Sequence, residues 1–250
     1  MLFRPTNPIS HRLARIAFLV ACVAALIVAA AGPLHRYLGL ERDAALGLFR
    51  YGFYLAAAAI ALGLATIVPT RPGDRRRGFV AAFLGLVIGV AAAWAPLLWL
   101  WHAYRVPALN DVTTDTADPP KLVITLEMRR GATNAAAYPG ESAASLQRAA
   151  YPDVAPIRLS VPPAEAFKKV DGAAMALGWD VVARAPNDGR IEAVATSEWF
   201  GLQDDISIRI RPDGAGSRVD IRSKSRTGTS DLGVNADRIR AFSDRLKTKP

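Results

Sequence analysis

Three long apolar runs occupy the N-terminal part of the chain and constrain its fold more than any other feature. They cover about residues 16–34, 44–68 and 79–101. Each run is close to the ~20 residues that an α-helix needs to cross the hydrocarbon core of a bilayer. The sequence therefore predicts an N-terminal membrane domain, residues 1–103, built from three transmembrane helices.

Charge is distributed unevenly between the two parts of the chain. Residues 1–103 contain 10 Lys and Arg against 3 Asp and Glu, whereas residues 104–250 contain 21 against 19. Most of the net charge of +9 therefore belongs to the membrane part. A nucleic-acid-binding protein needs a basic face on its soluble part, and this part is nearly neutral. We therefore expect no nucleic-acid partner.

Arginines beside the apolar runs predict the orientation of the chain in the membrane. Some precede the first run and others lie between the second and third runs: Arg4, Arg12, Arg15, Arg71 and Arg75–Arg77. Positively charged segments remain in the cytoplasm. Trp99 and Trp101 then lie at the outer interface, which is the usual place for aromatic belts. We expect a multi-pass protein of a bacterial inner membrane, with a cytoplasmic N-terminus and a periplasmic C-terminal domain.

Two alternatives concern the first run. Ala29–Ala31 resembles a signal-peptidase site, and Leu19–Cys22 resembles the processing site of a bacterial lipoprotein. An uninterrupted span of normal length needs no processing, so we favour the intact helix. Cys22 is the only cysteine, and an intrachain disulfide is therefore excluded.

Gly85 and Gly89 in the third run have the spacing that lets transmembrane helices approach closely. This spacing indicates either a homodimer or packing against the first two spans, and tethering to those spans favours the second interpretation. The apolar runs contain no Asp or Glu that would suggest an ion path.

Residues 104–156 form a proline-containing approach segment, in which Lys121–Met128 has the composition of a short strand. Residues 157–250 have the pattern of a compact α+β domain. A helix is expected after Pro163, four antiparallel strands follow between Trp179 and Arg222, and the last helix runs from about Val234 to Lys247. The expected fold is an antiparallel four-stranded meander flanked by two helices, after a three-helix membrane bundle.

The connection into the last helix carries the main candidate site for a ligand or partner. Its polar residues, together with two aromatic residues from an earlier loop, are Arg222, Lys224, Arg226, Asp231, Asn235, Arg238, Trp199 and Phe200. Cations ahead of a helix N-terminus can bind an acidic ligand such as a lipid headgroup. Equally, Asp231 can cap the helix and pair with Arg226, with the glycines serving only as turns.

Catalysis and metal binding have little support in the soluble part. All three histidines precede Tyr104, as does Cys22. This excludes the usual zinc sites and a Ser–His pair. Neighbouring Ser and Lys residues at positions 223–225 would face opposite sides of a strand. We expect no catalytic residue, no metal site and no cofactor.

The same connection resembles the signature of the domain of unknown function 1499 family. The matching residues are Ser223, Ser225, Arg226, Gly228, Asp231, Gly233, Asn235, Arg238 and Ile239. Earlier pieces are similar as well: Asp111–Asp115, Pro119–Pro120, Tyr151–Asp153, Gly178–Trp179 and Trp199–Gly201 before Asp204–Asp205. Leu122 departs from it, because an aromatic residue is expected there. The resemblance implies a family of bacteria and plants that is often attached to membrane spans, without a known activity.

We therefore expect a non-catalytic membrane protein whose extracytoplasmic domain binds a lipid, an acidic small molecule or an envelope protein. Membrane lipids are expected partners. The alternative is a membrane-anchored hydrolase with its site around Ser223–Asn235.

Overall fold

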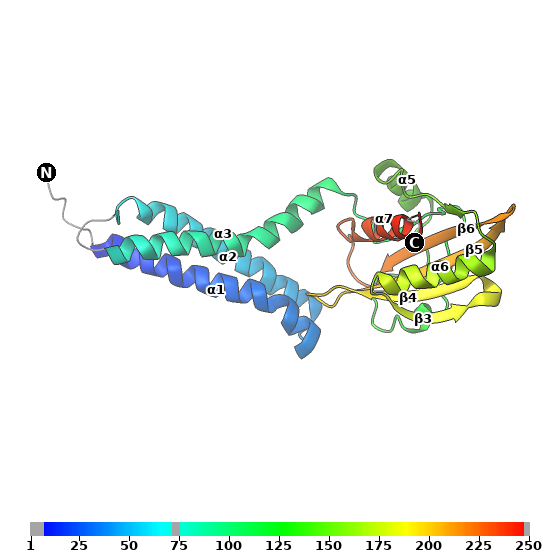
Figure 1. Ribbon diagram of the computed structural model, residues 1–250. Coiled ribbons are helices and arrows are strands. Elements are labelled where there is room, and N and C mark those ends of the chain that lie inside the picture. Colours follow the sequence, from blue (N-terminus) through cyan, green and yellow to red (C-terminus); the bar gives the residue numbers. More distant parts are fainter. Residues whose placement is uncertain (1–7, 72–75, 248–250) are drawn as a thin grey trace. The chain divides into compact units, whose positions relative to one another are not determined.

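The computed structural model describes residues 8–71 and 76–247 (Figure 1). It consists of two compact units. The first comprises Met1–Trp101 with Trp199–Gly201, and the second comprises His102–Glu198 with Leu202–Pro250. Arg4 and Arg75, which entered the orientation argument, lie outside the described residues, as do the side chains of Arg76 and Arg77.

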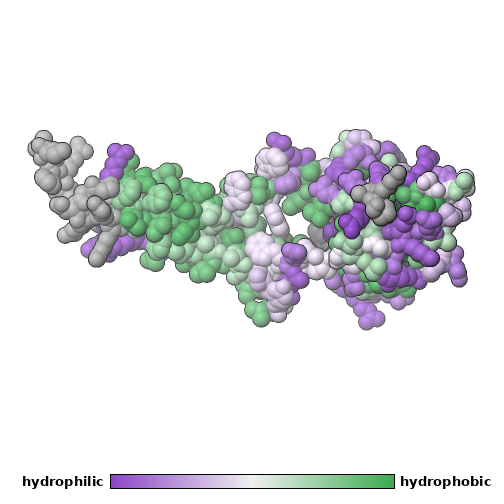
Figure 2. All heavy atoms as spheres, viewed as in Figure 1, coloured by the Kyte–Doolittle hydropathy of each residue, from purple (hydrophilic) through white to green (hydrophobic). Residues whose placement is uncertain are grey.

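Three long helices form the body of the first unit: α1 (Pro8–Leu38), α2 (Arg42–Ile67) and α3 (Arg76–Arg105). All three are long and apolar enough to cross a membrane. Figure 2 shows hydrophobic residues gathered over these helices. Large side chains such as Leu26 and Leu64 are exposed, as expected for surfaces that contact lipid. The prediction of three spans is confirmed, and the chain is a membrane protein.

Small residues let these helices approach one another closely. The buried positions of α1 are almost all Ala or Gly. A Cβ atom on Gly85 would lie 2.9 Å from the Phe18 backbone of α1, and one on Gly89 would lie 3.0 Å from Ile60 of α2. Both glycines therefore contact neighbouring spans of the same chain, as in the packing interpretation.

The second unit contains an antiparallel sheet with the strand order β1-β6-β5-β4-β3. The four predicted strands are β3 (Asp180–Ala185), β4 (Arg190–Thr196), β5 (Gln203–Asp213) and β6 (Gly216–Ser225). The 3₁₀ turn η1 (Pro186–Asp188) joins the first two of these strands. The α+β prediction is confirmed.

Two short strands make the sheet six-stranded rather than four-stranded. They are β1 (Asp111–Thr113) and β2 (Ile157–Leu159), and both pair with β6. Three residues are too few to show the alternation that identifies a strand in a sequence. Long-range pairing with β6 therefore creates them.

The approach segment has more helix than its sequence suggests. Lys121–Met128 was expected to be a strand, but its centre forms the one-turn helix α4 (Ile124–Glu127). The reason is distant in sequence: the Glu192 carboxylate accepts hydrogen bonds from the backbone N–H groups of residues 123–125. These are N–H groups that a helix leaves unpaired at its start. After Gly140 the chain forms α5 (Glu141–Ala150).

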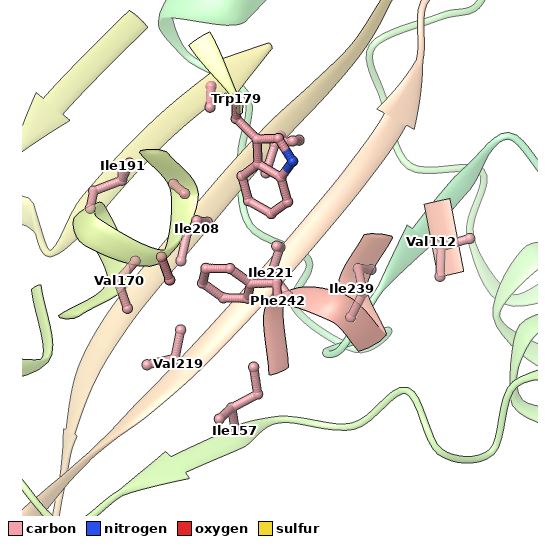
Figure 3. Close-up of a cluster of buried hydrophobic side chains, with 14 of the residues drawn as sticks. Val112, Ile157, Val170, Trp179, Ile191, Ile208, Val219, Ile221, Ile239 and Phe242 are labelled. Carbon is pink, nitrogen blue, oxygen red and sulfur yellow. The ribbon is translucent and has the colours of Figure 1, made fainter. Parts of the chain in front are cut away.

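An apolar core lies between one face of the sheet and two helices, α6 (Pro163–Ala176) and α7 (Val234–Lys247). Figure 3 shows Val170 of α6 and Phe242 of α7 directed toward Ile208, Val219 and Ile221 of the strands. The rings of Trp179 and Phe242 stack with 5.4 Å between their centroids. Alternate residues of β5 and β6 fill this core, and the intervening residues face the opposite side of the sheet.

A side chain makes hydrogen bonds to one residue at the outer edge of β1. The carboxamide of Gln147 on α5 accepts a hydrogen bond from the Thr113 N–H at 2.9 Å and donates one to the Thr113 carbonyl at 2.6 Å. Gln147 is buried. It therefore takes the place that one residue of another strand would have beside β1.

Candidate functional site

The sheet face opposite α6 and α7 is covered with charged groups that are shielded from water. Strand β6 is buried along almost its whole length, although every second residue from Arg218 onward is charged. Charged residues are seldom buried unless they are paired. We call this group the ionic layer; it contains Asp111, Arg129, Glu192, Asp205, Arg209, Asp220, Arg222, Lys224 and Arg226.

Asp111 on β1 holds two of the predicted site residues. Arg222 donates to both of its carboxylate oxygens, at 2.9 and 2.7 Å, and the Lys224 ammonium donates to one of them at 2.7 Å. Arg222 also donates to the Ala136 carbonyl at 2.8 Å and lies over the Tyr138 ring. A bidentate guanidinium–carboxylate pair is among the strongest polar contacts in proteins. We call residues 114–138, which lie over the ionic layer, the covering segment. The contacts of Arg222 join β1 and the covering segment to β6.

Asp205 on β5 likewise accepts hydrogen bonds from two cations, Arg226 and Arg129. One of its oxygens accepts both Arg226 hydrogen bonds, at 3.0 and 2.7 Å, and the other accepts from Arg129. Lys224 lies opposite Asp111 on one side and opposite Asp205 on the other. The central cation of the ionic layer is thus placed between two buried carboxylates by strand register alone.

The charged residues around Arg209 and Asp220, some of them outside the ionic layer, are balanced in charge. Asp115, Asp118 and Asp220 pair with Arg209, Arg211 and Arg218. Glu192 accepts backbone hydrogen bonds from the covering segment and the hydroxyl hydrogen bond of Thr125 at 2.7 Å. The covering segment is therefore attached to the sheet in two ways. Asp115 and Asp118 pair with arginines of the strands, and residues 123–125 donate hydrogen bonds to Glu192 of β4.

Around Asp111 and Asp205, cations outnumber carboxylates. Arg129, Arg222, Lys224 and Arg226 share these two acids in the part of the chain that the structure describes. Burial lowers the pKa of Lys224, although Asp111 acts in the opposite direction. Lys224 is 2% exposed, so it is held in place rather than presented to solvent.

The serines of the signature belong to the opposite side of β6. The Ser223 hydroxyl donates to the Asn235 side-chain oxygen at 2.7 Å and accepts from Arg238 at 2.9 Å. Asn235 also donates to Ser225 at 3.1 Å. These bonds join α7 to β6. Ser223 and Lys224 lie on opposite faces, and an amide oxygen is no general base, so the two residues do not form a nucleophile–base pair.

Asp231 caps the last helix. Its two oxygens accept hydrogen bonds from the backbone N–H groups of Gly233 and Asn235, at 2.8 and 3.0 Å. Burial raises the pKa of Asp231, while these two hydrogen bonds lower it. Arg226, the partner that the sequence suggested for Asp231, pairs with Asp205 instead. The capping prediction agrees with the contacts, and the expected Arg226–Asp231 pair is absent from the described ion pairs.

Arg238 and the two aromatic residues have other surroundings. Arg238 pairs with Asp204 at 2.7 Å. Trp199 and Phe200 belong to the first unit, where their ring centroids lie 5.4 and 5.9 Å from that of Phe49. Phe200 is buried. Trp199 and Phe200 are therefore described with the first unit, whereas the basic residues of β6 belong to the second.

Sequence reasoning missed the partners that determine the state of the basic residues. Asp111 and Arg129 were not among the candidates, and nothing in the local pattern of Arg129 marks it. Asp205 was expected to be a surface group paired with Arg209 or Arg211, but it is buried and pairs with Arg129 and Arg226. Asp205 had a signal, because alternation along adjacent antiparallel strands places it on the same face as Lys224. Within residues 8–71 and 76–247, no group of three or more His, Cys, Asp or Glu residues could hold a metal ion.

Replacing Asp205 by Asn is expected to destabilise the protein strongly. Arg129 and Arg226 would remain buried without a compensating charge, which costs about 3–5 kcal/mol. Asp213→Asn is the matched control, because Asp213 forms an exposed pair with Arg158 that contributes at most about 1 kcal/mol. Urea unfolding in detergent micelles measures both free energies. Equal losses for the two variants would contradict a structural role for the ionic layer.

Asp231→Asn should change how stability depends on pH. Because the folded pKa is raised above 3.8, Asp231 stabilises the fold below that value, and this contribution is lost as the pH rises through the folded pKa. The advantage of the wild type over Asp231→Asn in unfolding free energy should therefore be larger at about pH 4 than at about pH 7. Asp231→Ala removes both capping bonds and should cost about 1–2 kcal/mol. An advantage that grows toward neutral pH would contradict this assignment.

The comparisons with known proteins identify a family for the second unit. A family model described as "Protein of unknown function (DUF1499)" matches residues 111–246. A search of curated proteins finds no match to the chain. The matched range begins at Asp111 and contains the whole ionic layer, the caps of α7 and most of the apolar core. Because this match covers more than half of the 250 residues, the chain belongs to the DUF1499 family of proteins of unknown function.

Proposed function

We propose that the protein is a membrane-anchored, non-catalytic binding protein whose α+β domain contacts another protein of the bacterial envelope. One observation carries this proposal: a group of large apolar side chains is exposed around α4. Val123, Ile124, Leu126 and Met128 are each more than a third exposed. Exposed apolar residues that adjoin one another commonly mark a surface for a partner.

The structure around α4 makes this surface rigid. Three backbone hydrogen bonds to Glu192 hold the segment, and the Thr125 hydroxyl adds a fourth contact to the same carboxylate. Glu192 is buried and also lies 3.2 Å from Arg190. The apolar side chains are therefore presented from a fixed backbone, which reduces the entropy lost on binding. The exposed residues Lys121, Glu127 and Arg130 supply charges of both signs at its margin, as is usual at a protein interface.

Internal pairing argues against catalysis at the signature. Arg222, Lys224, Arg226 and Arg238 all donate to carboxylates of the same chain. A hydrolase centred on Ser223–Asn235 would need a base beside Ser223, and its contacts are Asn235 and Arg238. We therefore assign the signature residues a structural role: they stabilise the domain that presents the α4 surface.

A lipid or an acidic small molecule is the second candidate ligand. The excess of cations around Asp111 and Asp205 favours it, since an added anion would balance the charge. Arg226 is the cation of this group that would be accessible first, because its side chain is 12% exposed. Direct contact would require the anion to share cations that Asp111 and Asp205 already hold.

The α4 surface can be tested in cells by photo-crosslinking. A benzophenone amino acid at Leu126, which is 49% exposed, should yield a discrete adduct with a second protein. The same group at Met175 on α6, which is 53% exposed, should yield much less. Similar adducts at both positions would contradict a specific surface. Adducts with lipid alone, together with a bound anion in native mass spectrometry that Arg226→Gln removes, would favour the second candidate.

The periplasmic location has a separate test. Alkaline phosphatase folds to an active enzyme only outside the cytoplasm, so a fusion after residue 250 should be active. A fusion after Thr70, between α2 and α3, should be inactive and is the control. An inactive C-terminal fusion combined with an active fusion at Thr70 would reverse the orientation.

A further inference from the structure

An open pocket of about 230 Å³ lies beside the outer edge of β1. It is lined by residues 108–111, by Pro139, and by Ser142, Ala143 and Leu146 of α5. The pocket is smaller than the ~300 Å³ at which sites for drug-sized ligands begin. It has room for a short piece of chain, and its apolar side chains suit an aliphatic group.

The hydrogen bonding of β1 identifies the polar groups at this edge. Asn110 and Thr114 bond with β6 through their backbones: Ser225 donates to the Asn110 carbonyl, and Thr114 donates to the Ile221 carbonyl. Backbone groups of an antiparallel strand alternate in direction from one residue to the next. The N–H and carbonyl of Asp111 therefore face away from β6, on the same side as those of Thr113.

These two positions differ in one respect. Gln147 satisfies both backbone groups of Thr113 through its carboxamide. The register of β1 on β6 leaves the backbone groups of Asp111 outside the ladder of hydrogen bonds, and within residues 8–71 and 76–247 no turn, loop or side-chain hydrogen bond reaches them. Asp111 is 1% exposed, so its backbone groups are shielded from bulk water. An unpaired, buried backbone donor and acceptor are costly, and a pocket beside them is where a partner would compensate.

We propose that this pocket is a peptide-binding site, in which an extended segment of a partner protein pairs with the outer edge of β1 at Asp111. One residue of the segment makes at Asp111, through its own backbone N–H and carbonyl, the two hydrogen bonds that the Gln147 carboxamide makes at Thr113, roughly 6.6 Å further along the strand. Its side chain lies against Leu109, Ala143 and Leu146. This is strand addition confined to a short register, because Gln147 already occupies the next position.

Hydrogen bonding favours an uncharged peptide backbone over an anion. The Asp111 backbone offers one donor and one acceptor on the same side of the strand, which is the complement of the N–H and carbonyl of one residue in an antiparallel strand. A carboxylate or phosphate would leave the Asp111 carbonyl without a donor.

The inference shares with the proposed function only the premise that the occupant is a protein chain, and it concerns a different surface. The two therefore fail separately. Loss of crosslinking at Leu126 contradicts the α4 surface and does not affect the pocket. Absence of peptide labelling at Leu146 contradicts the pocket and does not affect α4.

The experiment uses the full chain in detergent micelles with a benzophenone amino acid at Leu146, which is 51% exposed beside the pocket. The probe is a pool of biotinylated, terminally blocked pentapeptides with a randomised central residue. A second pool carries an N-methyl group on every backbone nitrogen and cannot donate to the Asp111 carbonyl. We expect about tenfold more labelling by the first pool, since one lost hydrogen bond costs about that factor.

Controls separate strand pairing from simple apolar contact. A benzophenone at Met175 should give only background labelling with either pool. Adding Ser142→Trp at the pocket wall should abolish labelling at Leu146, whereas Ser145→Trp, on the same exposed helix but outside the pocket, should preserve it. Equal labelling by the two pools, or labelling at Leu146 no greater than at Met175, would overturn the proposal.

Discussion

Pairing between Asp111, Asp205 and four cations is the interaction on which the second unit depends. An α+β domain of this kind has an apolar core on one face of its sheet, and here the other face is also buried. Covering that face with apolar residues would have been the simpler solution. Instead, carboxylates attach the covering segment by directed hydrogen bonds, which require a particular register. The ionic layer therefore determines where residues 114–138 lie. It thereby also positions α4, which is part of this segment, and Pro139, which follows it and lines the pocket.

This arrangement changes the meaning of the most recognisable part of the sequence. A basic stretch before a helix is an obvious place for an anion, yet the basic residues of β6 are directed into the protein. Asn235 and Asp231 act at the same junction as a clamp and a cap. A signature that contains many polar residues can thus describe a scaffold. The surfaces that carry the proposals in this protein are α4 and the edge of β1, neither of which contains unusual residues.

The sequence predicted those parts of the structure that repeat regularly along the chain. The apolar runs identified three spans, and alternation identified the four strands β3 to β6. The strands β1 and β2 were not predicted, because three residues are too few to show alternation. The helix α4 was not predicted, because the hydrogen bonds that hold it come from Glu192, which is distant in sequence. At the candidate site, no local pattern indicates that Arg226 pairs with Asp205 rather than with Asp231. That choice depends on which strands are neighbours, and strand neighbours are set by the tertiary fold.

The contrast between the two faces of the sheet also bears on how the domain opens. Its apolar core is held by a largely non-directional force that salt and mild acid weaken little. The covering segment is held instead by ion pairs and directed hydrogen bonds, which lose their strength once water enters. Residues 114–138 are therefore expected to behave as a separate cooperative unit that detaches while α6, α7 and the sheet remain folded. Such a partly opened form would expose the charged face of an intact sheet. The apolar core, whose exposure leads to aggregation, would stay covered by α6 and α7.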